Sequence, residues 1–142
     1  MKDRLLIVDD EQDFIMLLKI QLEKAGYMVE SAMNGKGAVD AYTLSLSEDR
    51  PISLIILDML LPDINGMEVA RMIRDKETQK SIEGKRSASI ILLTGNDRSW
   101  MDPSENIDID SYLLKPVGFP ELLKLIEEQL KVKKGIHLKE SS

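Results

Sequence analysis

The stretch ISLIIL at positions 52–57, followed directly by Asp58, decides the fold of this chain. An almost wholly apolar run of this length is typical of a central strand in a parallel sheet, because helices cover both faces of such a strand. An acidic residue that closes an apolar strand is unusual. The stretch therefore predicts a buried parallel strand and marks Asp58 as the first candidate for chemistry.

Short apolar runs alternate with longer segments of helical period on both sides of this strand. Further strands are predicted at Arg4–Val8, 27–32, 89–93 and Ser111–Leu114, and the weak alternation of 27–32 favours the edge of the sheet. Helices are predicted between the strands, and the fourth of them is short or frayed around 98–101. The order βαβαβαβαβα indicates an α/β fold with a doubly wound, five-stranded parallel sheet. Apolar residues at helical spacing mark the other helices: Phe14, Leu17, Leu18 and Leu22; Ala38, Val39, Tyr42 and Leu46; Met67, Ala70 and Ile73; Phe119, Leu122, Leu123, Ile126 and Leu130.

Length and composition exclude several classes of protein. The 142 residues fit one domain at 1–131, followed by a polar tail at 132–142. The chain has no cysteine, and its one histidine, His137, lies in the tail, so thiolate sites and Ser-His-Asp catalysis are not expected. The formal net charge of −6 argues against binding nucleic acid by broad phosphate neutralisation. No segment is apolar enough to cross a membrane. We expect a cytoplasmic protein with no direct nucleic-acid partner and no membrane partner.

Polar residues stand where the predicted strands end. Asp9 and Asp10 end the first strand, Asp58 the third, Thr94 the fourth and Lys115 the fifth, so their side chains should meet at one rim of the sheet. Three neighbouring carboxylates repel one another, which favours a hard divalent cation such as Mg²⁺ between them. Lys115 and Thr94 add a positive charge and a hydroxyl donor, which suit a phosphoryl group. Asp58 is then the expected nucleophile, giving an aspartyl-phosphate.

These residues, in this order and at these strand ends, form a highly specific pattern. Over residues 3–131 the chain resembles the receiver domain of bacterial two-component response regulators, and the resemblance also rests on Pro62, Gly66, Tyr112 and the pair Lys115-Pro116. It implies a flavodoxin-like (βα)5 fold with strand order 2-1-3-4-5. It also implies a signalling switch that catalyses only its own phosphorylation and slow dephosphorylation, rather than an enzyme acting on metabolites.

The resemblance assigns roles in the metal and phosphoryl site. Asp58 would be the phospho-acceptor, charged by a histidine kinase or a histidine phosphotransfer protein. Asp10 and Asp58 would bind Mg²⁺ directly, Asp9 mainly through water, and the backbone carbonyl of Leu60 would complete the protein's share of the ligands. Lys115 would pair with the phosphoryl group.

The resemblance also implies how the signal leaves the site. Thr94 would move toward the phosphoryl group and Tyr112 would turn inward as the coupled aromatic switch. The Lys115–Pro116 peptide bond would be cis. A downstream protein partner or effector would bind the face made by the fourth helix, the fifth strand and the fifth helix. The chain either acts alone or belongs to a larger regulator.

Plainer structural interpretations stand beside these roles. Asp9 and Asp10 could cap the helix that follows them, because Asp is favoured at that position. Tyr112 could be an ordinary half-buried strand residue. The polar stretch 75–87 is expected to end a helix and to form a surface loop without a function.

Three other functions compete with the phosphorylation switch. A dehalogenase-type phosphatase would place its two acids two residues apart after the first strand, whereas Asp9 and Asp10 are adjacent. A flavin-binding module would need a loop rich in Ser, Thr and Gly at that place. A receiver-like scaffold that no longer relies on phosphorylation is the remaining alternative.

Overall fold

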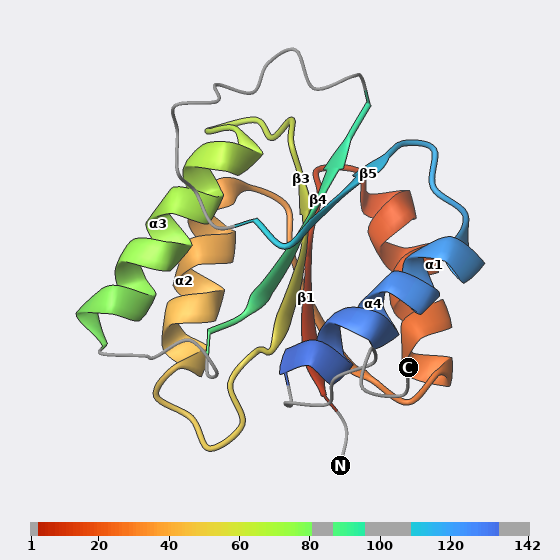
Figure 1. The fold of residues 1–142 in the computed structure, drawn as a ribbon. Helices are drawn as coiled ribbons and strands as arrows, with labels where there is room; N and C mark the ends of the chain where they lie inside the picture. Colours follow the sequence, from red (N-terminus) through yellow and green to blue (C-terminus); the bar gives the residue numbers. More distant parts are fainter. Residues whose placement is uncertain (1–2, 81–86, 96–108, 134–142) are drawn as a thin grey trace.

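The five strands form one parallel sheet in the order β2-β1-β3-β4-β5 (Figure 1). The structure is a computed structural model that describes residues 3–80, 87–95 and 109–133. It confirms the predicted doubly wound α/β fold and strand order, while the helix predicted around 98–101 lies outside the described residues. The elements are β1 (Arg4–Val8), α1 (Gln12–Lys24), β2 (Met28–Ala32), α2 (Gly35–Ser45), β3 (Leu54–Asp58), α3 (Gly66–Gln79), β4 (Ser89–Thr94), β5 (Ser111–Leu114) and α4 (Phe119–Lys133).

Helices cover both faces of the sheet, with α2 and α3 on one side and α1 and α4 on the other (Figure 1). Successive strand residues point to opposite faces, so each central strand contributes to two apolar cores. On β1, Leu6 and Val8 pack on the side of α2 and α3, whereas Leu5 and Ile7 pack on the side of α1 and α4. This double burial explains why the central strands are continuous apolar runs.

Burial falls from the centre of the sheet to its edges. Every residue of β3 is buried between β1 and β4, as its apolar sequence predicts. The edge strand β2 contains one buried residue, Val29, which confirms the prediction that the least apolar strand lies at an edge. The other edge strand, β5, is only partly buried. The apolar content of each strand therefore follows its place in the sheet.

Local signals fix several helix ends. Gly26 follows the last residues of α1 with a φ of 104°, the left-handed conformation that glycine adopts at little cost, and so ends the helix. Asn34 caps α2 by accepting the Gly37 N–H at 2.7 Å. Asn65 caps α3 in the same way, through the Glu68 N–H at 2.8 Å. Each cap satisfies a donor that has no partner within the helix.

A buried acid lies in the stretch that the sequence describes as a polar helix end and loop. Glu77 on α3 is 4% exposed and accepts the Tyr42 hydroxyl at 2.5 Å and the Ala88 N–H at 2.9 Å. Arg74 donates to the same carboxylate at 2.9 Å and also contacts Asp110 at 3.3 Å. Burial and the charge of Glu77 raise the pKa of Tyr42. The network joins α2, α3 and the starts of β4 and β5.

Candidate functional site

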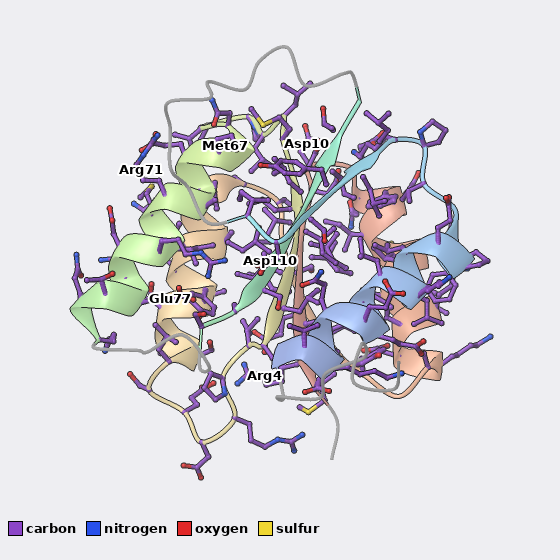
Figure 2. The ribbon with its side chains drawn as sticks, in the orientation of Figure 1. Arg4, Asp10, Met67, Arg71, Glu77 and Asp110 are labelled. Carbon is purple, nitrogen blue, oxygen red and sulfur yellow. The ribbon has the colours of Figure 1, made fainter. Side chains whose placement is uncertain are left out.

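The register of β1 and β3 brings Asp9 and Asp58 together at the carboxyl end of the sheet. Val8 on β1 pairs with Leu57 on β3, so the residues that follow them, Asp9 and Asp58, lie side by side. Both are buried, whereas Asp10 is exposed at the rim (Figure 2). Asp9, Asp10 and Asp58 each offer a carboxylate oxygen, and these oxygens lie within 4.8 Å of one another. The predicted convergence of the three acids is therefore present.

Lys115 reaches the same cluster from the end of β5. Its Nζ lies 3.1 Å from Asp9 Oδ2 and 3.4 Å from Asp58 Oδ1. The backbone holds it there, because the Lys115 N–H donates to the Thr94 carbonyl at 2.7 Å. The Lys115–Pro116 peptide bond is cis, as the resemblance implies. The ammonium also lies 5.3 Å from the centre of the Phe14 ring. The site thus combines three acids and one amine drawn from three strands.

The electrostatics of the cluster follow from burial and from these contacts. Burial raises the pKa of Asp58, and the neighbouring charge of Asp9 raises it further, against the opposing effect of Lys115. For Lys115, burial acts to lower the pKa, but the hydrogen bond to Asp9 and the charge of Asp58 outweigh it and the pKa is raised. The raised pKa keeps Lys115 charged, while the raised pKa of Asp58 is chiefly the result of burial.

The geometry does not support the alternative that the Asp pair serves to cap α1. The N-cap position of α1 is Glu11, and its side chain makes no capping hydrogen bond. Asp9 accepts the Glu11 N–H at 2.8 Å, and its other oxygen binds Lys115. The Asp9 carboxylate is thus used for the cluster of acids and for the turn that leads into the helix.

The loop after Asp58 is closed by backbone contacts. The Gly66 N–H donates to the Met59 carbonyl at 2.7 Å, and a Cβ at Gly66 would lie 2.6 Å from the Asp58 carbonyl oxygen. Only glycine fits this approach, so Gly66 serves the geometry of the loop. The Leu60 N–H lies 3.4 Å from Asp58 Oδ1, and the Leu60 side chain is exposed. The role of the Leu60 carbonyl as a metal ligand stays a prediction.

Asp63 in the same loop binds the first turn of α2. Its two carboxylate oxygens accept the Gly35 N–H at 2.8 Å and the Lys36 N–H at 2.9 Å. These two hydrogen bonds lower the pKa of Asp63. The sequence pattern did not single out this residue.

The lowered pKa of Asp63 predicts a pH-dependent contribution to stability. A carboxyl group with a depressed folded pKa stabilises the protein above its unfolded pKa of about 3.9, and this contribution is lost as pH falls through the lower folded value. We expect Asp63→Asn to lower the melting temperature near neutral pH. The difference from the wild type should shrink as the pH falls through the folded pKa of Asp63. Thermal unfolding over a pH series measures this, and a constant difference would contradict it.

Thr94 and Tyr112 line a common cavity between the end of β4, β5 and the start of α4. Thr94 ends β4 and is 3% exposed, and Tyr112 lies on β5 and is half-buried. Both line a cavity of about 380 Å³, together with Glu121 at the start of α4. The structure brings the two side chains to one space, which suits a coupled movement, and their switch roles stay predictions.

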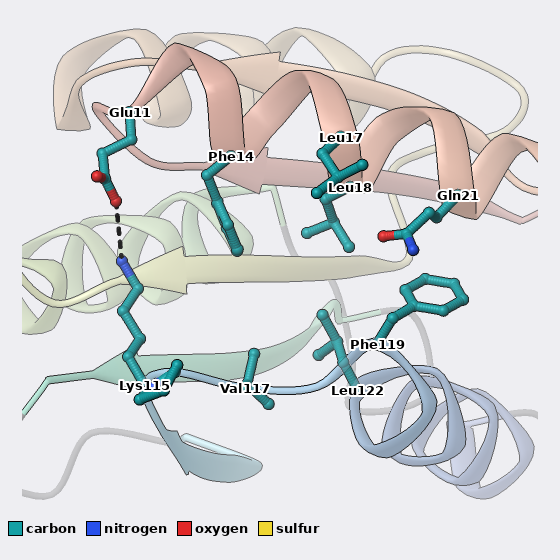
Figure 3. A pocket seen from close by; sticks show the side chains of 10 residues that line it. Glu11, Phe14, Leu17, Leu18, Gln21, Lys115, Val117, Phe119 and Leu122 are labelled. Atoms are coloured by element: carbon teal, nitrogen blue, oxygen red, sulfur yellow. Dashed lines mark ion pairs between the residues drawn. The ribbon is translucent and has the colours of Figure 1, made fainter.

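A second hollow opens beside Lys115, between α1 and the chain that leads into α4 (Figure 3). Its volume is about 510 Å³, and Phe14, Leu17 and Phe119 give it a mainly apolar lining. Glu11 lies at the same end as Lys115, with Oε1 4.0 Å from Nζ. The acid cluster is therefore flanked by an apolar groove on the side of α1.

Comparison with known proteins assigns the family. A family model described as the response regulator receiver domain matches residues 5–127. The chain belongs to this family. Response regulator ArlR of Staphylococcus epidermidis is 34% identical over 129 residues, covering 89% of this chain and 52% of that relative. The uncharacterized transcriptional regulatory protein YkoG of Bacillus subtilis is 34% identical over 132 residues, covering 92% of this chain and 52% of the relative.

Solved receiver structures have the same fold. A CheY-like receiver domain protein from Methanospirillum hungatei has a TM-score of 0.73 at 25% identity, with 96% of this chain and all of that chain covered. Response regulator TrrA from Thermotoga maritima, solved in complex with Mg²⁺–BeF, has a TM-score of 0.67 at 34% identity, with 90% and 98% covered. The chain is thus a response regulator receiver domain of two-component signalling.

The comparisons also correct one expectation about partners. The receiver domain spans about half the length of the curated relatives it matches. One of those longer proteins is named as a transcriptional regulatory protein, so the prediction of no direct nucleic-acid partner is not borne out. In the described part of the chain, none of the helices has the length and apolar character needed to span a bilayer.

Proposed function

We propose that this receiver domain accepts a phosphoryl group on Asp58 from the phosphohistidine of a histidine kinase or phosphotransfer protein. The observation that carries the proposal is the Lys115 ammonium, 3.4 Å from Asp58 Oδ1, beside a cluster of three carboxylates. An acid held next to a fixed positive charge is arranged to bind the oxygens of a phosphoryl group as the new bond forms.

The residues present fit a magnesium ion. Three carboxylates against one ammonium leave an excess of two negative charges, which one divalent cation balances. Hard oxygen ligands are those that Mg²⁺ prefers. Asp9, Asp10 and Asp58, with the Leu60 carbonyl, would hold it. When bound, the ion would neutralise charge on the phosphoryl oxygens.

The transfer itself needs little from the protein beyond position and charge. A carboxylate oxygen of Asp58 forms a bond to phosphorus while the phosphorus–nitrogen bond of the donor breaks, and the imidazole nitrogen keeps the electron pair. Lys115 remains charged throughout because its pKa is raised. The raised pKa of Asp58 reflects an anion that lacks solvation, which favours its reaction with an electrophile.

Thr94 and Tyr112 would carry the change to a partner. A phosphoryl group on Asp58 would draw the Thr94 hydroxyl toward it, and Tyr112 would occupy the cavity that the two residues share. The altered face, made by the fourth helix of the family, β5 and α4, would bind a downstream protein or effector. In this view the domain catalyses only its own phosphorylation and slow dephosphorylation.

Phosphorylation by a small donor tests the proposal. With acetyl phosphate and Mg²⁺, we expect the intact mass of the wild type to rise by one phosphoryl group, and with a chelator in place of Mg²⁺ we expect no rise. An unmodified protein that nevertheless binds Mg²⁺ would favour a receiver-like scaffold instead.

A further inference from the structure

The contacts of Asp63 link two parts of the chain that are far apart in sequence. Its carboxylate binds the Gly35 and Lys36 N–H groups, which precede it by 28 and 27 residues. Both donors lie in the first turn of α2, where helix N–H groups have no carbonyl partner within the helix. The loop that follows the phospho-acceptor is therefore attached to α2 by a bidentate side chain.

Beneath this attachment, Ile64 and Val69 pack closely against the glycine that begins α2. A Cβ at Gly35 would lie 2.5 Å from Ile64 Cγ1 and 2.8 Å from Val69 Cγ2. The loop residue Ile64 thus sits directly on the glycine that begins α2. At the other end, the bond from the Gly66 N–H to the Met59 carbonyl fixes the base of the loop.

Leu60 lies between these two points but has no comparable anchor in its own side chain. That side chain is 70% exposed, whereas its neighbours Met59 and Leu61 pack against the core on the side of α2 and α3. The path of the chain from Asp58 to Asp63 then determines where the Leu60 carbonyl points.

We propose that Asp63 is a positioning residue for the metal site, because it fixes the loop that presents the Leu60 carbonyl. The inference rests on the proposed function, since it assumes that Mg²⁺ binds beside Asp58. Asp63 does not touch the ion in this view. It acts through the backbone of residues 60–63, as residues around a metal ligand commonly do.

Asn34 provides a matched control. It caps the same helix end, accepting the Gly37 N–H at 2.7 Å, but it does not belong to the acceptor loop. Asn34→Ala and Asp63→Ala should therefore both lower the melting temperature, because each removes a cap from α2. Only Asp63→Ala should alter the metal site.

Calorimetric titration with Mg²⁺ alone measures the difference. We expect Asp63→Ala to raise the Kd for Mg²⁺ about tenfold and Asn34→Ala to leave it within about twofold of the wild type. With acetyl phosphate, Asp63→Ala should be modified slowly at limiting Mg²⁺ and at close to the wild-type rate when Mg²⁺ is saturating.

Other outcomes overturn the inference in distinguishable ways. Equal Kd values for Asp63→Ala and the wild type would show that Asp63 is a cap and nothing more. A wild type that does not bind Mg²⁺ would remove the proposed function along with the inference. If Asp63→Ala does not fold, Asp63→Asn replaces it, since its one carbonyl oxygen can retain part of the attachment and should give an intermediate Kd.

Discussion

Asp58→Ala is expected to carry no phosphoryl group under conditions in which the wild type carries one. The loss should be complete rather than partial, because the substitution removes the oxygen that forms the new bond. We do not expect Asp9 to replace it, although Asp9 also lies beside Lys115, because its two oxygens already bind the Glu11 N–H and the Lys115 ammonium. Intact mass after treatment with acetyl phosphate and Mg²⁺ measures the result.

Two controls separate this loss from unfolding. Asp40→Ala removes an exposed acid on α2, far in sequence from the site, and should leave the modification intact. Burial and the charge of Asp9 raise the pKa of Asp58, so its ionised form destabilises the folded protein near neutral pH. Asp58→Asn removes that charge and should, without Mg²⁺, melt at a higher temperature than the wild type. A modification of equal extent on Asp58→Ala would place the acceptor elsewhere and contradict the proposal.

Glu77→Ala should be strongly destabilising, with a loss of about 3 kcal/mol in the free energy of unfolding. The substitution leaves the Tyr42 hydroxyl and the Ala88 N–H without their acceptor, and it leaves the Arg74 guanidinium without its buried partner. Unsatisfied buried groups lose their interaction with water as well as their partner, so the cost exceeds that of an ordinary hydrogen bond. Urea unfolding measures the loss.

The same helix offers a matched comparison. Glu68 pairs with Arg71 at the same three-residue spacing, but both side chains are well exposed. Glu68→Ala should therefore cost less than about 1 kcal/mol. If the two substitutions prove equally mild, the buried network does not contribute as its geometry indicates. Because the network is distinct from the acid cluster, folded Glu77→Gln should still take a phosphoryl group.

Much of the fold follows from local sequence features. The run before Asp58 is apolar because β3 has helices on both faces, and the weak alternation of β2 reflects an edge position. The carboxyl ends of parallel strands share one rim of the sheet. The sequence therefore suffices to predict that Asp9, Asp58 and Lys115 meet there. Pattern and topology together carried that prediction.

The parts that could not be predicted depend on contacts across long sequence separations. Glu77 looks like a surface acid in a polar stretch, and its burial follows from Tyr42, 35 residues earlier, and from Ala88, 11 residues later. Asp63 similarly finds its partners on a helix that precedes it. Such hydrogen bonds do not recur at a regular spacing along the chain, so no sequence pattern predicts them.

The position of Lys115 has a mechanical consequence. The strand that it follows, β5, pairs among the described residues with β4 alone, yet the Lys115 ammonium binds acids at the ends of β1 and β3. The outermost strand is thereby connected to the middle of the sheet by two ion pairs: the pair with Asp58 crosses β4, and the pair with Asp9 crosses β4 and β3. Any event that draws the Lys115 ammonium away from Asp9 loosens the restraint on β5. A change of charge in the acid cluster therefore alters the mobility of the edge strand.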